Sequence, residues 1–380
     1  GVKQTDGSYL FTKDTKITLT SGNVIQPGYD STININAAGT ALTTSVNGSN
    51  LLTGIYNTSS NGNVNITADK TILNINNDNT GFVQKAYGIW MNSDGGKVTI
   101  SGLTEINTNA ADLSYGINAS FGNIQVDGLH VKVNKDAGYA RSFSLDGNSK
   151  VAVNVKDGTA GLNEVKIDGD IFSSSKVSDN GYTTPKNSTI DLALTTSDSY
   201  FNGLSSYEYK SDYDEYEDAT TTLSHGTVNL WLQNGATWIN AKYGNAGYAS
   251  GFMGSALTKL VGGKDSASAG VIFQKDSKDI NVDNYSGYTT VLFTHDSVMP
   301  TTINGGDVKI GNASVGSNIT LRTDYDANMS NSVIQNNVLN ALANKLYYTA
   351  YTTGERNLSG KVQIAEGLTA QSAAKYVGDV

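Results

Sequence analysis

The 380-residue chain contains no cysteine and only three prolines. Without cysteine there are no disulfides, no thiol catalysis and no cysteine-ligated metal sites. Charged residues are scarce as well, at 16% of the chain where about 25% is usual. No apolar run approaches the ~20 residues of a membrane-spanning helix. The chain is therefore not expected to span a membrane.

Positive charge is the scarcer sign, with 26 Lys and Arg against 35 Asp and Glu and a formal net charge of −9. No basic cluster matches the electrostatic footprint of a nucleic-acid-binding protein, and anionic lipid surfaces are equally unsuited as partners. The first four residues, Gly-Val-Lys-Gln, do not resemble a signal peptide. We expect any export signal to have been removed.

Glycine is abundant, at 41 residues, and much of the remaining chain is Asn, Ser, Thr and Asp. These residues are poor in helix interiors, so the composition disfavours a helical protein. Disorder is disfavoured too, because Val, Ile, Leu, Tyr and Phe recur along nearly the whole length. The composition predicts an all-β protein with many turns.

Three segments of the chain align with one another, beginning at Leu52, Ala86 and Ser114. Each contains three short alternating stretches separated by Gly, Asn, Ser or Asp turns. The starts are roughly 34 and 28 residues apart, which is in the range of solenoid and propeller repeats. The sequence is therefore built from a repeated three-strand unit.

Aliphatic residues within each repeat lie two apart, as in Val64-x-Ile66, Val98-x-Ile100 and Ile124-x-Val126. Period two sends aliphatic side chains to one face of a strand and polar side chains to the other. Such strands bury their apolar face when copies stack above and below. The pattern predicts a right-handed parallel β-helix. A β-propeller or sandwich is the alternative, disfavoured by the drifting period and the few Asn-Gly hairpin turns.

We expect three regions along the chain. Residues 1–260 form the main β-helix, with loop insertions near 173–189 and 198–222. Residues 261–329 form further β-helix coils. Residues 330–380 begin with a short amphipathic helix, predicted from apolar residues four apart at Ile334, Val338, Leu342 and Leu346. We expect Ser330 or Asn331 to cap this helix and the start of a β segment to follow it.

The C-terminal part resembles the passenger domains of autotransporters, the type V secreted proteins with a pertactin-like β-helix. Residues 228–239 read Val-Asn-Leu-Trp-Leu-Gln-Asn-Gly-Ala-Thr-Trp-Ile, similar to their L-x-N-x-A-x-W element. Residues 279–296 are similar to the coil before their junction, or autochaperone, region. Residues 344–369 are similar to large autotransporters of anaerobic bacteria. Thr289 stands where the family has glycine, and no run of outer-membrane barrel strands precedes Val380.

The resemblance covers residues 225–380 well, and earlier residues only through the β-helix pattern. It implies a secreted passenger, displayed outside the cell at the bacterial outer membrane, whose C-terminal coils fold first. Passenger domains include adhesins, proteases and esterases, so the fold does not determine the function.

Enzyme motifs are mostly missing. The histidines His130, His225 and His295 are far apart and fit no metal or protease spacing. A pair of Asp or Glu residues suffices for glycoside cleavage, and Asp168, Asp170 and Asp191 are candidates only as strand-edge aspartates. We expect no enzymatic activity. A glycan-cleaving lyase or glycosidase on the same scaffold is the alternative.

One segment combines alternating aromatic and acidic side chains. Three readings stay open for it: a solubilising loop, a recognition loop for glycan or protein, and a Ca²⁺ site built from oxygen ligands. No cofactor is otherwise expected. The candidate binding residues are Tyr207, Tyr209, Asp212, Tyr213, Asp214, Glu215, Tyr216, Glu217 and Asp218.

Four tyrosines recur beside the Gly-Ile position of the repeat or its equivalent: Tyr56, Tyr87, Tyr115 and Tyr139. Stacked in register they would form an aromatic strip along one edge, which either stabilises the solenoid or serves in sugar binding or self-association.

We therefore expect a non-enzymatic surface adhesin that acts by multivalent, shallow contact. Its partners would be host glycans, matrix proteins or other copies of the passenger, as in aggregation and biofilm. A structural stalk is a further alternative.

Overall fold

The computed structural model describes residues 1–48, 51–78, 83–173, 176–179, 182–185, 187–206, 226–244, 254–299, 301–324, 332–348, 358–364 and 375–376. The protein is nearly all-β, with 66% strand and 4% helix. Its strands pair in parallel from one turn of the chain to the next, which confirms the predicted β-helix. The chain divides into two compact units.

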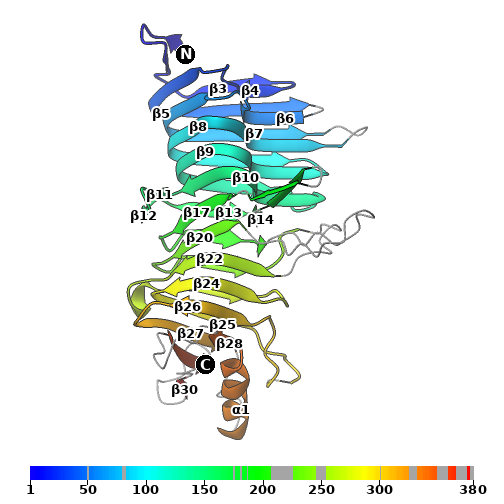
Figure 1. Cartoon of the computed structure of the whole chain (residues 1–380), viewed down its shortest axis with the longest axis vertical. Helices are drawn as coiled ribbons and strands as arrows, with labels where there is room; N and C mark the ends of the chain where they lie inside the picture. The colour runs from blue at the N-terminus through cyan, green and yellow to red at the C-terminus, as the bar shows by residue number, and fades with distance from the viewer. Residues whose placement is uncertain are drawn as a thin grey trace. The chain divides into compact units, whose positions relative to one another are not determined.

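Unit 1 comprises Gly1–Ala193, Ser206–Thr227 and Tyr243–Phe252. Its strands are β1 Val2–Lys3, β2 Tyr9–Leu10, β3 Thr15–Leu19, β4 Asn23–Ile25, β5 Thr32–Gly48, β6 Leu51–Asn57, β7 Asn63–Asn77, β8 Lys85–Asn109, β9 Leu113–Val133, β10 Tyr139–Val153, β11 Val155–Lys156, β12 Thr159–Ala160, β13 Val165–Asp168, β14 Asp170–Ser173, β15 Lys176–Asp179, β16 Tyr182–Pro185 and β17 Thr189–Leu194. Figure 1 shows β5, β7, β8, β9 and β10 in this stack, where each pairs with the next.

The aliphatic residues of the repeat form columns inside unit 1. Val64 pairs in register with Val98, Val98 with Ile124, and Ile124 with Val151. All four side chains are at most 1% exposed. Each such side chain contributes about 1.5–3 kcal/mol when fully buried. The period-two pattern therefore works as predicted, because each strand finds its apolar partners in the coils above and below.

A glycine marks one corner of three successive coils in unit 1. Gly54, Gly88 and Gly116 sit where the strand pairing skips one residue. A Cβ on Gly88 would lie 2.6 Å from the Gly116 carbonyl oxygen and would collide with the Ile106 side chain. Glycine is needed here because the neighbouring coil and the opposite face of the core leave no room for a side chain.

Unit 2 comprises Leu194–Ser205, Val228–Lys242 and Met253–Val380. Its elements are β18 Tyr200–Asn202, β19 Ser205–Ser206, β20 Thr227–Leu232, β21 Thr237–Asn240, β22 Ser255–Val261, η1 Ser266–Ser268, β23 Gly270–Gln274, β24 Ile280–Ser286, β25 Tyr288–Phe293, β26 Val308–Ala313, β27 Ser317–Thr323, α1 Ser332–Ala343, β28 Leu346–Tyr348, β29 Leu358–Ile364 and β30 Lys375–Tyr376. Two parallel ladders run through it. One joins β20, β22, β24, β26 and β28, and the other joins β18, β21, β23, β25, β27 and β29.

Buried aromatic and amide side chains organise the core of unit 2. Trp238 is fully buried, stacks on Phe201 with ring centroids 5.7 Å apart, and donates its indole N–H to the Gly203 carbonyl at 2.9 Å. Asn240 and Gln274, in successive coils, are hydrogen-bonded side chain to side chain at 2.5 Å. Burying these polar groups costs little stability because they find partners inside the coil stack.

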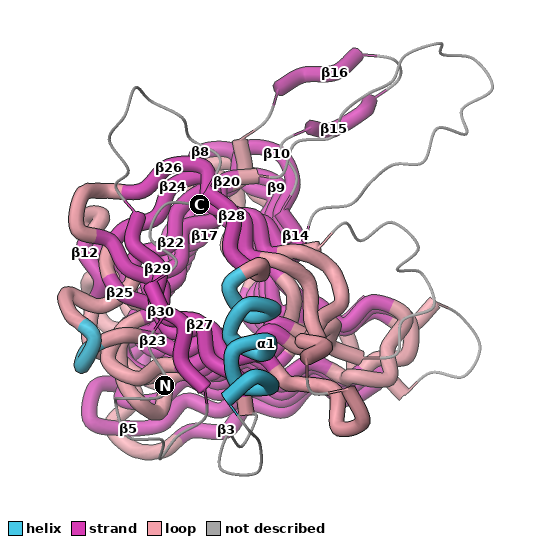
Figure 2. Tube along the Cα trace, turned by 90° about the horizontal axis from the view of Figure 1, so that it is seen from below, coloured by secondary structure: helices cyan, strands magenta, loops and turns pink. Residues whose placement is uncertain are grey.

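The C-terminal helix is confirmed but is shorter than its apolar pattern suggested. α1 ends at Ala343 and contacts β27 and β29 (Figure 2). Val338 and Leu342 are fully buried, as predicted for its apolar face. Leu346 was wrongly assigned to the helix. It lies in β28, where it pairs with Val308, because the open edge of β26 offers it a parallel partner. The predicted caps Ser330 and Asn331 lie outside the described residues.

The predicted loop insertions contain strands. Within 173–189, β15 and β16 pair antiparallel as a separate hairpin. Within 198–222, β18 pairs in parallel with β21 and so belongs to a coil of unit 2. Residues 207–222 lie outside the described part of the chain.

Candidate functional site

A surface groove of about 310 Å³ crosses three successive coils of unit 1. It is lined by Asn74, Ile75 and Asn76 of β7, by Asn107, Thr108 and Asn109 of β8, and by Lys132, Val133 and Asn134 at the end of β9. Its volume is at the lower end of the about 300–1,000 Å³ typical of ligand sites.

Strand alternation determines what the groove presents. Ile75, Thr108 and Val133 are buried and form the floor between two outward columns. Their neighbours on either side point outward, because side chains two apart share a face of the strand. The first outward column contains Asn74, Asn107 and Lys132, and the second contains Asn76 and Asn109, with Asn134 lining the groove just after the strand pairing ends.

The asparagines of neighbouring coils form side-chain ladders. Asn107 Nδ2 donates to Asn74 Oδ1 at 2.9 Å, and Asn109 Nδ2 donates to Asn76 Oδ1 at 2.7 Å. A primary amide carries two N–H donors and two acceptor lone pairs, so each of these groups keeps hydrogen-bonding capacity after the ladder is made. Asn107 and Asn109 are exposed to solvent. The groove therefore offers fixed, uncharged donors and acceptors.

Hydrogen bonds fix the β9 end of the groove, and this end contains the one positively charged side chain of the lining, Lys132. Asn134 Nδ2 donates to the Ala110 carbonyl at 3.1 Å, which fixes the turn after β9. Lys132 is exposed and pairs in register with Asp168 of the next coil. The Tyr243 hydroxyl donates a long hydrogen bond of 3.5 Å to the Val133 carbonyl. Burial, with the carboxylates of Asp168, Asp170 and Asp136 nearby, raises the pKa of Tyr243 to about 12.

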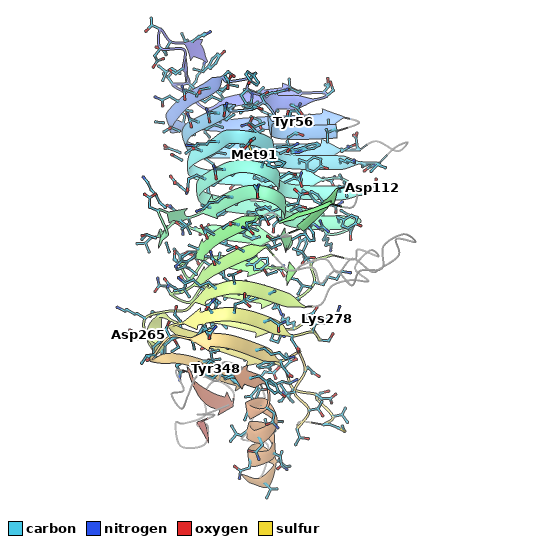
Figure 3. All side chains as sticks on the ribbon, viewed as in Figure 1. Tyr56, Met91, Asp112, Asp265, Lys278 and Tyr348 are labelled. Atoms are coloured by element: carbon cyan, nitrogen blue, oxygen red, sulfur yellow. The ribbon has the colours of Figure 1, made fainter. Side chains whose placement is uncertain are left out.

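Two of the four predicted strip tyrosines share a register, and a third reaches them only through Trp90. Tyr87 and Tyr115 pair in register, with ring centroids 5.5 Å apart. Tyr56 pairs with Trp90 instead, at 5.3 Å, and Trp90 in turn contacts Tyr87 at 4.8 Å. Figure 3 labels Tyr56 and, on the next coil, Met91. The four do not form one column, because Tyr56 follows the Gly-Ile position and pairs with Trp90, and Tyr139 pairs with Leu113.

Arg141 takes the place of an aromatic in the coil after Tyr115. Its guanidinium lies 5.6 Å from the Tyr115 ring centroid, 4.9 Å from that of Tyr139 and 4.0 Å from that of Phe172. Tyr87, Tyr115, Arg141 and Phe172 are each at most 8% exposed. Burial, followed by the neighbouring Tyr115, raises the pKa of the Tyr87 phenol well above its ordinary value. The cluster thus resembles a packed structural joint more than an open sugar platform.

The candidate carboxylates have structural partners. Asp170 Oδ1 accepts a hydrogen bond from the Tyr243 backbone N–H at 3.0 Å. Asp191 Oδ2 lies 3.4 Å from Lys150 Nζ. These contacts anchor a loop and pair strand neighbours, and none of them places two carboxylates across a cleft.

Each described histidine lies within hydrogen-bonding distance of a carboxylate. His130 Nε2 lies 2.7 Å from Glu164 Oε1, which is also 2.8 Å from Lys166 Nζ. The hydrogen bond from Lys166 is the largest of the effects that lower the pKa of Glu164. His295 Nδ1 lies 2.6 Å from Asp324 Oδ1. His225 lies outside the described residues.

The acidic, tyrosine-rich candidate loop, Tyr207 to Asp218, also lies outside the described residues, so its three interpretations remain predictions. Among the residues that the structure describes, no group of three or more His, Asp or Glu side chains is placed to hold a metal ion. In the same part of the chain, no helix has the length and apolarity needed to cross a membrane.

Sequence reasoning does not single out the groove residues, because they form the polar half of an ordinary alternating pattern. A signal for them exists: Asn74-Ile-Asn76, Asn107-Thr-Asn109 and Lys132-Val-Asn134 place two amides, or an ammonium and an amide, two residues apart in three successive repeats. Repetition of one polar residue type at the same outward position predicts a chemically uniform column.

Comparison of the chain with protein-family models, with curated proteins and with solved structures finds no match.

Proposed function

We propose that the protein is a glycan-binding adhesin, and that the amide-lined groove of unit 1 is its contact site. The observation that carries this proposal is the pair of asparagine ladders beside the floor of the groove, Asn74 with Asn107 and Asn76 with Asn109, in which the β8 asparagines are exposed and the β7 asparagines half-buried. Side-chain amides that are already ordered lose little entropy on binding, and they match sugar hydroxyls as both donors and acceptors.

The wider setting of this proposal is the bacterial cell surface. The resemblance of residues 225–380 to autotransporter passengers supports export and display there. Shallow sites of this kind bind weakly one at a time, and many copies on one cell would convert them into firm attachment through avidity. The partner on this view is a host or environmental glycan, and no chemical transformation is involved.

A glycan array probed with the purified chain tests the proposal. The test variant is Asn107→Ala with Asn109→Ala, which removes the middle rung of both ladders. The matched control is Asn63→Ala with Asn65→Ala, which removes two amides from another face of β7, where Asn65 Nδ2 donates to Asn34 Oδ1 at 2.8 Å. The wild type and the control should bind the same glycans, and the test variant should bind them at least several-fold more weakly.

Two results would overturn the proposal. One is an array on which the wild type binds no glycan. The other is a test variant that binds as well as the control, since the groove would then not be the contact site. Cells that display the chain should also attach to surfaces coated with the bound glycan, and cells that display the test variant should not.

A further inference from the structure

Polar side chains line the groove once per coil, and this regular spacing favours a ligand with a similar repeat. The β7 and β8 coils each contribute one asparagine to each outward column, and the β9 end contributes Lys132 and Asn134. Successive strands of a sheet are about 4.8 Å apart. An extended polysaccharide has a similar length per sugar unit. A chain of sugars lying along the stacking direction would therefore meet two polar side chains at each step, asparagine pairs on the β7 and β8 coils and Lys132 with Asn134 at the β9 end.

The ladders also have a direction. Asn107 and Asn109 donate toward the β7 coil, so Asn74 and Asn76 use their carbonyl oxygens as acceptors. Their own Nδ2 groups have no hydrogen-bond partner among the described residues, and neither do the Oδ1 atoms of Asn107 and Asn109. The groove thus offers amide donors at its β7 end and amide acceptors on the β8 rung.

Charge favours an uncharged ligand. The four ladder side chains are neutral, and the lone ammonium, Lys132, pairs in register with Asp168 of the next coil. Asp136 and Asp170 stand near the same end, around Tyr243. The net charge of the whole chain is −9, which repels polyanions over longer distances. Acidic polysaccharides would gain little at Lys132 and would meet repulsion elsewhere.

We infer that the groove binds an extended, uncharged glycan that lies along the coil-stacking direction, with one sugar unit on each of the three coils. This inference rests on the proposed glycan-binding function and adds to it the class, the direction and the length of the ligand.

Titration calorimetry with oligosaccharides of defined length tests the inference. The probes are β-1,4-linked oligomers of glucose, N-acetylglucosamine, mannose and xylose, each from one to six units. Affinity for at least one series should rise about three- to tenfold per added sugar up to three units and should then level off, because each step adds one or two hydrogen bonds. Maltohexaose, the α-1,4-linked glucose hexamer that coils, should bind no better than its monomer.

A mutation can shift the length at which affinity levels off. Asn74→Ala with Asn76→Ala removes the amides of the β7 coil and leaves two coils with polar side chains. The plateau should move from three sugars to two. The control Asn63→Ala with Asn65→Ala alters the same strand on another face and should leave the plateau at three.

Several outcomes would overturn the inference. These are affinity that does not depend on length in all four β-1,4 series, maltohexaose binding as tightly as the best extended hexamer, a uronic acid oligomer binding more tightly than every neutral one, or a plateau that the β7 variant does not move. If one of these outcomes is found while the glycan array shows binding that depends on the groove, the inference fails but the proposed glycan-binding function is retained. An array without any bound glycan would instead remove the function itself.

Discussion

The Asn107 side-chain amide donates a hydrogen bond to the Asn74 carbonyl oxygen at 2.9 Å, although 33 residues separate the two along the chain. Parallel stacking brings them together, because residues at equivalent places in successive coils lie one strand spacing apart. The same geometry lets the ladder stabilise the coil stack and also present amide groups to a ligand. These two roles can be separated by mutation.

Asn107→Ala should lower the free energy of unfolding by about 0.5–1 kcal/mol, since it removes one solvent-exposed amide hydrogen bond without opening a cavity. Urea denaturation followed by circular dichroism measures the change. Asn65→Ala removes an equivalent bond to Asn34 away from the groove and should cost about the same. Only the Asn107 variant should lose glycan affinity. Equal losses of affinity in both variants would contradict the assignment of the site.

Gly88→Ala should destabilise unit 1 by about 1–3 kcal/mol, because the added methyl would collide with Ile106 and would lie 2.6 Å from the Gly116 carbonyl oxygen. Thermal unfolding of the variant measures this loss. Gly128→Ala is the matched control: its Cβ would make ordinary contacts of 3.4 Å and longer, so its stability should change by less than about 1 kcal/mol. Equal stability of the two variants would mean that the corner tolerates a side chain.

Glu164→Gln should flatten the pH dependence of stability in acid. Lys166 lowers the pKa of Glu164 by its hydrogen bond, so the carboxylate stabilises the fold above the ordinary glutamate pKa of about 4.3. That contribution is lost as the pH falls through the lower pKa of the folded state. The Glu164 side chain is 36% exposed, so solvent screening keeps the effect below about 1 kcal/mol.

Urea midpoints of the wild type and Glu164→Gln between about pH 5 and about pH 3 measure this slope. Lys166→Gln should reproduce the flattening, because it removes the partner that lowers the glutamate pKa. Parallel curves for the wild type and both variants would show that the ion pair does not contribute.

Tyr243→Phe should protect the protein against alkaline destabilisation. Burial, and then the nearby carboxylates, raise the pKa of the Tyr243 phenol from 10.0 to about 12 in the folded state. Its stabilising contribution is therefore complete below about pH 10 and declines as the pH rises toward 12. The wild type should lose of the order of 2 kcal/mol more than the variant over this range.

Unfolding by urea at pH 9, 10, 11 and 12 measures the difference between the wild type and Tyr243→Phe. The phenylalanine ring keeps the packing, so both proteins should have similar stability at neutral pH apart from the long hydrogen bond to Val133. A variant that loses stability with pH as steeply as the wild type would show that Tyr243 titrates at its ordinary value.

The fold was predictable because its main determinant is local. The two-residue spacing in Val64-x-Ile66 and Val98-x-Ile100 predicts that one face of each strand is apolar. The sequence repeat predicts that such strands stack, and stacking places these residues in buried columns. Leu346 shows the limit of this reasoning. Its four-residue spacing fits a helix, but pairing with Val308 gives it a strand partner that periodicity does not reveal.

The candidate site depended on register, which only the tertiary structure decides. The sequence by itself determined that Tyr56 and Tyr87 flank a Gly-Ile corner and that Asn74 and Asn107 are polar positions in alternating strands. The coil lengths then aligned Tyr56 with Trp90 and brought Asn107 under Asn74. Each coil contains a different number of residues at its corners, and a shift of one residue moves a side chain to the opposite face of the strand. The composition of the chain thus defines which groups are available, and the stacking of the coils defines which of them meet.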